Sequence, residues 1–391
     1  MKKFFTVLFV ILLAYLLSYY TVGKENGHKL INTDFEFEEI IKKIENLAEQ
    51  DSKRYNNESA SSEDSLVAIE YFDVGLADFN AGNYEQALSN FEMALAYDYK
   101  NLDALFYKGK TEFELNDYYT AIYSFEDLLY YEPNYDSAYF YKGIAIYKQE
   151  DYQTAINDLY VFINNNPQAK KAYYYLSKAY YYNGQLPIAI ESCSNEIKNN
   201  PEYSPAYFWR GYLYIENEQY EISITDNEKA LELNPTDQYA AFNIGFAYEK
   251  LEKLDFALKF YNKSAEIAPE YNRAYDGMGK VYYQQKKYDK AIESLTKSIE
   301  LDESYYYSLN SRGATHMQLK DYDSAILDFQ TVLLYDSDNL YALFKEAECN
   351  DLLGKTEDAI TCYNNYLYYA TTDDTYYQIA TNRISELSNN Q

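Results

Sequence analysis

Two successive stretches near the middle of the chain decide the fold. Residues 240–269 read AAFNIGFAYEKLEKLDFALKFYNKSAEIAP, and residues 273–302 read RAYDGMGKVYYQQKKYDKAIESLTKSIELD. In the first stretch, Gly245 is followed three places later by Tyr248 and twelve places later by Ala257. The second stretch repeats these residues 34 places further on, as Gly279, Tyr282 and Ala291. A fixed period of this length is typical of a stacked helical array.

The same two small-residue positions recur without a gap through most of the chain. The first position is filled, every 34 residues, by Gly75, Gly109, Gly143, Ser177, Gly211, Gly245, Gly279, Gly313 and Ala347. The second is filled by Ala87, Ala121, Ala155, Ala189, Ser223, Ala257, Ala291, Ala325 and Ala359. Small residues at both places predict two helices whose axes approach closely.

We divide residues 68–373 into nine units, numbered from the N-terminus. Their first residues are 68, 102, 136, 170, 204, 238, 272, 306 and 340. Each unit carries two apolar patterns of helical period with a turn between them, and in unit three these predict helices over 137–148 and 152–164. Asn166-Pro167 ends the second helix, because proline cannot donate the next helical hydrogen bond. Only stacking can bury the faces of such units.

The pattern resembles the tetratricopeptide repeat family. In units six and seven, the small residue of the first helix, the aromatic three places later and the alanine of the second helix match the family's unit, and the same register extends over residues 68–373. The resemblance implies an all-α fold, a right-handed α-solenoid (superhelix) of antiparallel helix pairs. It also implies a concave groove, lined by the first helix of each unit, that binds a peptide or protein segment.

By the family's register, the sixth residue of each unit is expected to point into that groove. In units two to five this residue is Tyr107, Tyr141, Tyr175 or Trp209, where family members usually carry polar or charged residues. Six neighbours complete the candidate groove: Lys110, Lys148, Lys171, Lys178, Tyr182 and Tyr212. Aromatic and basic side chains are frequent at interface hot spots, which favours partner binding. The alternative is compositional, because a chain with 51 tyrosines places many of them in its core.

The aromatic series ends after unit five. The sixth residue of units six to nine is Asn243, Gly277, Ser311 or Lys345. The family's best-known subset binds a C-terminal carboxylate through a lysine and an asparagine, at the fifth and ninth residues of a unit. No unit here has lysine at the fifth or asparagine at the ninth place, so chaperone-tail binding is not implied.

Units four and five depart from the pattern. Glu196 and Ser223 stand at places that are alanine in other units, and Asn227 stands where Phe91 and Phe125 stand in units one and two. Local drift at half-buried positions is the favoured interpretation, since an array tolerates one poor interface. A weak seam or bend between units four and five is the alternative.

Residues 1–23 have the form of a signal anchor or signal peptide. Lys2 and Lys3 precede an apolar run from Phe4 to Tyr20, which is longer than the core of a usual signal peptide. An uncleaved single-pass anchor and a cleaved signal both stay open. Either places the repeats outside the cytoplasm, on the cell membrane or, after cleavage, secreted or periplasmic.

The remaining end segments predict short accessory elements. Residues 24–67 predict an extra helix, over 33–54, and a polar linker. Residues 374–391 predict a C-terminal capping helix that begins at Thr372-Asp373-Asp374, ends near Leu387 and covers unit nine.

Composition excludes several classes of function. A net charge of −28 disfavours nucleic acid and leaves residues 1–23 as the predicted link to a membrane. Cys193, Cys349 and Cys362 show no metal-ligand spacing, so we expect no metal and no cofactor. Cys193 is expected in the core, whereas a disulfide between the other two stays open. The segments outside the repeats are too short for a catalytic domain, so we predict no enzyme.

Three functions fit these observations. The first is a non-catalytic protein-protein interaction scaffold of the cell envelope that binds a peptide or protein segment in the groove. The second is a carbohydrate-binding or cell-wall accessory protein, since aromatic faces also suit sugars. The third is a regulatory subunit that recruits a separate enzyme.

Overall fold

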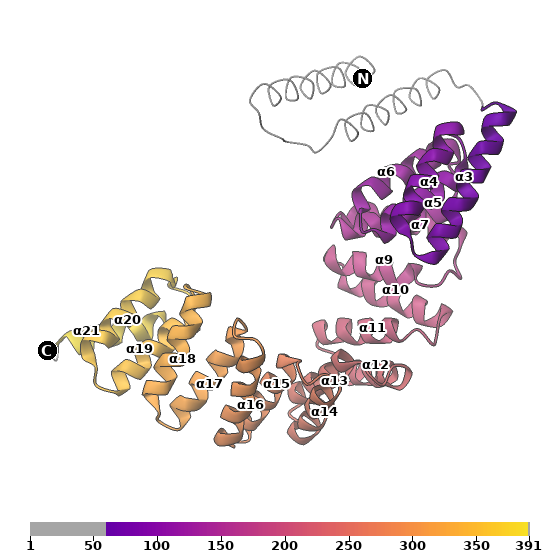
Figure 1. The fold of residues 1–391 in the computed structure, drawn as a ribbon. Coiled ribbons are helices and arrows are strands. Elements are labelled where there is room, and N and C mark those ends of the chain that lie inside the picture. The colour runs from indigo at the N-terminus through magenta and orange to yellow at the C-terminus, as the bar shows by residue number, and fades with distance from the viewer. Residues whose placement is uncertain (1–59, 390–391) are drawn as a thin grey trace, which may run out of the picture. The chain divides into compact units, whose positions relative to one another are not determined.

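The computed structural model describes residues 60–389, and the regular structure in this range is helical (Figure 1). The helices are α3 (Ser62–Ala81), α4 (Tyr84–Tyr97), α5 (Leu102–Glu114), α6 (Tyr118–Tyr131), α7 (Asp136–Lys148), α8 (Tyr152–Asn165), α9 (Ala172–Tyr182), α10 (Leu186–Asn199), α11 (Ser204–Glu216), α12 (Tyr220–Leu233), α13 (Gln238–Lys250), α14 (Leu254–Ile267), α15 (Asn272–Gln284), α16 (Tyr288–Leu301), α17 (Tyr306–Gln318), α18 (Tyr322–Tyr335), α19 (Leu340–Leu352), α20 (Thr356–Tyr369) and α21 (Tyr377–Asn389).

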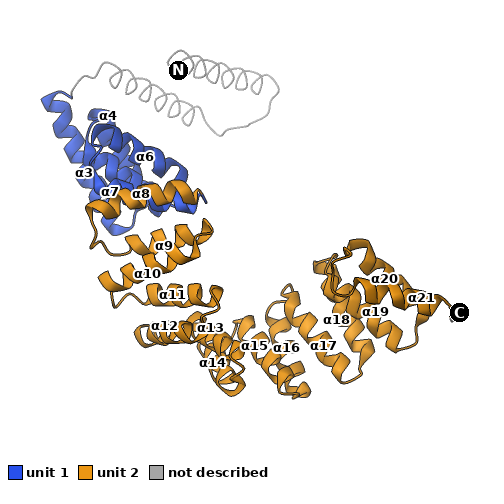
Figure 2. Cartoon of the chain, turned by 180° about the vertical axis from the view of Figure 1, so that it is seen from behind, with its two compact units in different colours: residues 1–150 blue, residues 151–391 orange. Residues whose placement is uncertain are grey.

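The chain divides into two compact units of structure (Figure 2). The first ends at Glu150 and contains α3 to α7, and the second begins at Asp151 and contains α8 to α21. In the second, the first helices of successive repeats contact one another, from α11 through α13, α15 and α17 to α19. The prediction of an all-α solenoid of paired helices is confirmed.

The turn between the two helices of each repeat uses left-handed backbone at one fixed position. The residues there have φ from 56° to 81°: Gly82, Asn116, Glu150, Gly184, Glu218, Glu252, Lys286, Lys320 and Gly354. Glutamate and lysine adopt this conformation at a cost that glycine avoids. The packing of the two helices, rather than the residue in the turn, therefore holds the hairpin closed.

The small residue of a first helix lies against a residue sixteen places later in the second helix. A Cβ added at Gly245 would come within 2.8 Å of the buried Tyr261 ring, nearer than the ~3.5–4.0 Å of ordinary carbon contacts. In unit four, Ser177 fills the glycine position and donates a hydrogen bond to the Ala189 carbonyl at 2.7 Å. Close approach of the helices is thus the rule at this position.

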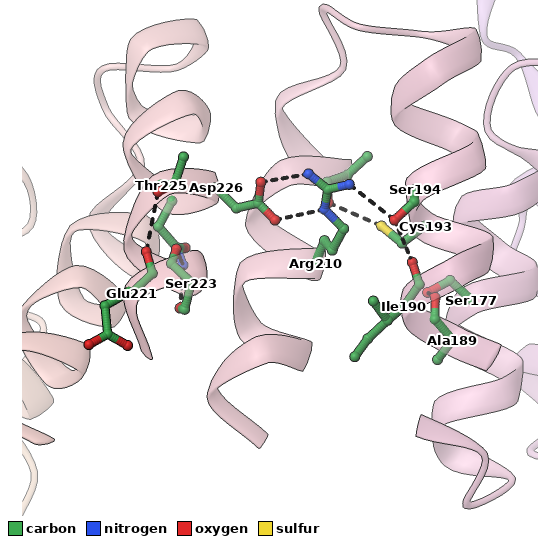
Figure 3. Close-up of polar contacts among 12 residues, drawn as sticks. Ser177, Ala189, Ile190, Cys193, Ser194, Arg210, Glu221, Ser223, Thr225 and Asp226 are labelled. Carbon is green, nitrogen blue, oxygen red and sulfur yellow. Dashed lines mark hydrogen bonds and ion pairs between the residues drawn. The ribbon is translucent and has the colours of Figure 1, made fainter. Parts of the chain in front are cut away.

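A polar bridge joins units four and five, where the sequence departs from the pattern (Figure 3). Arg210 of α11 donates through Nε and Nη2 to Asp226 of α12, both at 2.7 Å, and through Nη1 to Ser194 of α10 at 3.0 Å. Equivalent contacts recur three repeats later, from Arg312 to Asp328 and Thr296. The arginine connects three helices, so this junction has specific contacts, which argues against the alternative of a weak seam.

Glu196, at an alanine position, caps a helix. Its buried carboxylate accepts hydrogen bonds from the backbone N–H groups of Lys171 at 2.7 Å and Tyr174 at 3.3 Å, at the start of α9. Lys171 has φ 69°, and α9 begins only at Ala172. Burial raises the pKa of Glu196, although the backbone donors favour its ionised form. The substitution is therefore not drift.

Both ends of the described range differ from the predicted boundaries. α3 begins at Ser62, within the predicted linker, because the Ser61 hydroxyl accepts from the Asp64 N–H at 3.1 Å as a helix cap. α21 begins at Tyr377, after a turn in which Asp374 accepts a hydrogen bond from Thr371. α21 packs against α20.

The predicted signal segment of residues 1–23 and the extra helix over 33–54 lie outside the described residues. Among residues 60–389, no helix is both long and apolar enough to span a membrane. The three cysteines are free thiols, so Cys349 and Cys362 form no disulfide in this structure. Cys193 is buried as expected, and burial raises its pKa to about 12.

Substituting Gly245 tests the close helix packing. Tyr261 is confined between Gly245 and Gly277, where an added Cβ would lie 2.6 Å from the ring, so the ring cannot move aside. We expect Gly245→Ala to lower the free energy of unfolding by about 1–3 kcal/mol, although alanine is the better helix former. Urea unfolding followed by circular dichroism measures this change in the free energy of unfolding. In a Tyr261→Leu background the same substitution should be nearly neutral; an equal loss there would contradict the packing.

Candidate functional site

The sixth residue of a repeat contacts the core residue that lies sixteen places earlier, in the preceding repeat. In the first compact unit, the rings of Tyr107 and Phe91 lie 5.9 Å apart, and those of Tyr141 and Phe125 lie 6.1 Å apart. Tyr107 and Tyr141 are half-buried, and burial raises the pKa of Tyr141. The contacts observed for these two tyrosines are therefore packing contacts between repeats.

Trp209 is the most enclosed member of the aromatic series. Its side chain is 7% exposed, and its Nε1 donates a hydrogen bond to Ser177 Oγ at 3.0 Å. It stacks on Tyr212 at 5.3 Å and meets Tyr181 edge-on at 5.4 Å, in the same core cluster as Cys193. The expectation that Trp209 points into an open groove is not met, because the small Cys193 side chain leaves room for the indole beneath the surface.

Among the other predicted site residues of the second compact unit, Tyr182, Tyr212 and Lys178 contact this tryptophan. Tyr182 is exposed and stacks on Tyr152 and Trp209, with centroids 5.3 Å and 6.4 Å away, and Tyr175 is half-buried. The Lys178 ammonium lies 5.1 Å from the Trp209 ring centroid. Lys171 is exposed at the start of α9. Binding of a partner by these residues stays a prediction.

The two predicted site lysines of the first compact unit have different surroundings. Lys110 Nζ lies over three rings, those of Phe79, Tyr107 and Tyr141, at 5.0 to 5.6 Å from their centroids. Lys148 is exposed in the last turn of α7. Rings from three successive repeats thus surround the Lys110 ammonium, which is the geometry of a cation–π cluster.

From unit six onward the sixth residue is small or polar. Asn243 donates to Asn227 at 3.4 Å, and Gly277 makes room for the Tyr261 ring. The Tyr261 hydroxyl then reaches α13, where it donates to Glu249 Oε2 at 2.7 Å. Side chains at the sixth place therefore no longer cover this part of the first helices.

A pocket of about 420 Å³ opens in this region of the second compact unit. Its lining comes from the first helices of units six to nine: Glu249 of α13; Lys280, Tyr283 and Gln284 of α15; Tyr307, Asn310, Ser311 and Ala314 of α17; and Tyr341 of α19. Tyr307 is 53% exposed and Tyr341 38% exposed. Three tyrosines and five polar or charged residues line this concave surface together with Ala314, and concave surfaces that combine aromatic and polar groups can bind ligands.

The two charged residues of the pocket lining, Glu249 and Lys280, have different kinds of partner. Glu249 accepts hydrogen bonds from Tyr261 and, at 3.3 Å, from Gln284, and burial raises its pKa. Lys280 pairs with the buried Asp276 at 2.6 Å, and Asp276 also accepts from Ser308 at 3.0 Å. The lysine therefore already has a carboxylate partner within its own helix.

Two further groups complete the polar lining. The Asn310 side-chain oxygen is buried and has no hydrogen-bond partner among the described residues. Burial raises the pKa of Tyr341 to about 12, so its hydroxyl stays protonated at neutral pH. The Asn310 oxygen is thus an unsatisfied acceptor beneath the pocket surface.

Sequence reasoning missed every residue of this pocket except Ser311, which it noted only as the end of the aromatic series. The available signal was the change of the sixth residue to glycine and serine in units seven and eight. It coincides with tyrosine at the second place of units eight and nine, Tyr307 and Tyr341.

Trp209 and Tyr307 should respond differently to truncation. Trp209→Ala leaves a cavity between repeats, and we expect it to cost about 3–5 kcal/mol of unfolding free energy. Tyr307→Ala, at an exposed position, should cost less than about 1 kcal/mol. Urea unfolding and amide exchange of α9 to α11 measure both. If Trp209→Ala unfolds like the unmodified protein, the indole is not a core residue.

Comparison with known proteins agrees with the geometry. Models described as tetratricopeptide repeat match residues 72–136, 204–237, 236–304, 277–338 and 341–370, which together cover more than half of the chain. No protein of curated function matches the sequence.

Several solved structures share the fold at low identity. One is the C-terminal part of a TPR repeat-containing protein from Cytophaga hutchinsonii, with 20% identity, 61% of this chain and 98% of that chain covered, and a TM-score of 0.51. A tetratricopeptide repeat protein from Parabacteroides merdae has 16% identity, coverages of 65% and 98%, and a TM-score of 0.50. The APC/C hetero-tetramer Cut9-Hcn1 has 14% identity, coverages of 82% and 76%, and a TM-score of 0.50. The chain belongs to the tetratricopeptide repeat family.

Proposed function

We propose that this protein is a non-catalytic interaction scaffold that binds an extended peptide segment of a protein partner in the pocket of α13, α15, α17 and α19. The observation that carries the proposal is the pocket itself, formed by four consecutive first helices where the sixth residues leave the surface open. Repeats of this family serve protein and peptide binding, and their arrays are generally not catalytic.

The lining suits a peptide in two ways. Tyr283, Tyr307 and Tyr341 offer aromatic faces from three successive repeats, and tyrosine is enriched at interface hot spots. Asn310 and Gln284 carry amides that can pair with a peptide backbone. Each face comes from a helix fixed in the array, so the site is largely formed before binding, which limits the entropy lost on binding.

The carbohydrate hypothesis loses its main support. It rested on the aromatic series of units two to five, and Tyr107, Tyr141 and Trp209 contact rings of their own array. A regulatory subunit that recruits an enzyme is a special case of the scaffold and uses the same pocket.

We also propose that the repeats lie outside the cytoplasm, anchored by residues 1–23 or released after their cleavage. This part of the proposal rests on sequence alone, on Lys2 and Lys3 before the apolar run from Phe4 to Tyr20.

Truncating the pocket tyrosines tests the binding site. Dodecamer peptides selected by display against the full chain should bind about tenfold or more weakly to Tyr307→Ala and Tyr341→Ala, because each loses an aromatic contact. Fluorescence anisotropy gives the affinities, and circular dichroism reports the helicity, which should not change.

The matched control is Tyr368→Ala. Tyr368 is 81% exposed on the second helix α20 and lies away from the pocket lining. It should leave peptide affinity unchanged. Equal effects of the control and pocket variants, or no effect of either, would place the peptide site elsewhere.

Protease accessibility tests the location. External protease added to cells with a permeabilised outer layer should degrade the repeats while a cytosolic marker survives. Lysis of the inner membrane serves as the control that the repeats are cleavable. Survival of the repeats until that lysis would contradict the orientation.

A further inference from the structure

We infer that the pocket of units six to nine takes a cationic side chain, specifically the arginine of a partner segment. The inference rests on the proposed function and adds the chemical class of the residue that the pocket recognises. It is drawn from three properties of the lining: its hydrogen-bonding groups, its aromatic faces and its charge.

The first property is an excess of acceptors. Glu249 contributes a carboxylate whose two oxygens accept one hydrogen bond each in the structure, so lone pairs remain. The Asn310 amide oxygen has no partner among the residues described but is buried, so a ligand reaches it only after this side chain turns toward the pocket. The ammonium of Lys280 is directed to Asp276 at 2.6 Å. A ligand that donates several hydrogen bonds suits this set, and guanidinium carries five N–H donors.

The second property is the aromatic lining. Tyr283, Tyr307 and Tyr341 come from α15, α17 and α19, so their rings border the pocket from successive repeats. Aromatic faces attract cations, and guanidinium also stacks on them. Elsewhere in the chain, the rings of Tyr174 and Trp209 each lie about 5 Å from the Lys178 ammonium, at 5.0 and 5.1 Å. In the pocket, the Lys345 ammonium lies 5.9 Å from the Tyr341 ring centroid, whereas Lys280 pairs with a carboxylate, so Tyr283 and Tyr307 are the rings offered to a ligand cation.

The third property is charge. Lys280 is paired with the buried Asp276, which leaves the ionised Glu249 carboxylate as the uncompensated charge of the lining, although Lys250 also lies near it. The whole chain carries a net charge of −28, so its field also favours a cationic partner. A partner's C-terminal carboxylate finds no unpaired cation here. The pocket volume of about 420 Å³ is large enough for an arginine side chain and part of the backbone of that arginine.

The test compares three pentapeptides on the full chain in mild detergent. They are acetyl-Gly-Ser-Xaa-Ser-Gly-amide with arginine, citrulline or norleucine at Xaa. Citrulline keeps the shape of arginine but replaces guanidinium by neutral urea, and norleucine keeps only the apolar stem. We expect the arginine peptide to bind about tenfold more tightly than either, with an advantage that falls as salt is raised. Equal or tighter binding of citrulline or norleucine overturns the inference.

Glu249→Gln isolates the carboxylate while keeping an oxygen that accepts the Tyr261 hydroxyl. It should remove most of the arginine preference, whereas the matched control Glu266→Gln, at an exposed site on α14, should keep it. Lys280→Gln removes the competing ammonium and should strengthen arginine binding. A preference unchanged by Glu249→Gln overturns the assignment of this carboxylate.

The pH dependence has a defined sign. Burial and, to a smaller extent, Asp276 raise the pKa of Glu249, whereas the Tyr261 hydrogen bond, Lys280 and Lys250 lower it, and the net shift is upward. Only the ionised form of Glu249 attracts guanidinium. The arginine preference should therefore be full above this raised pKa and lost as the pH falls through it, whereas norleucine binding should not change.

The outcomes separate the inference from the proposed function. If the selected dodecamers lack arginine but still depend on Tyr307, the scaffold proposal stands and the arginine inference falls. If no peptide of either kind binds in a Tyr307-dependent way, both fall.

Discussion

The structure depends on one packing constraint, the fit of a single residue of each second helix between two neighbours. That residue faces the small residue sixteen places before it in the same repeat and the sixth residue of the next repeat, sixteen places after it. Tyr261 shows both contacts, because Gly245 and Gly277 each leave space for its ring. Protein interiors are close-packed, so the ring of Tyr261 fits because both neighbouring positions are glycine.

The sixth residue of the repeat decides where the first helices are covered and where they are open. A small Cys193 accompanies the large Trp209, and a large Tyr261 accompanies Gly277. In the first case the aromatic ring of the next repeat completes the core. In the second case the Tyr261 ring of the preceding repeat fills the core, and the surface of α13, α15 and α17 stays open for the pocket. Packing and recognition are therefore two uses of the same position in the repeat.

The period of 34 residues predicted the helix pairs of unit three to within one residue at each end, because glycine, alanine and proline mark the hairpin directly. The direction of the sixth side chain was not predictable from its own residue type, since it depends on the volume opposite. Glu196 was read as drift because its partners, the backbone N–H groups of Lys171 and Tyr174, become visible only once α9 is placed. The pocket combines four repeats that no single motif connects.

Ser311→Tyr tests the account most directly, because it restores an aromatic sixth residue at the wall of the pocket. The measurement is the affinity of a selected pocket-binding peptide together with the free energy of unfolding. The account predicts that the variant stays folded, with unfolding unchanged to within about 1 kcal/mol, and loses peptide binding because the new ring covers the first helices. A folded variant with unchanged affinity would contradict the claim that the open sixth position creates the site.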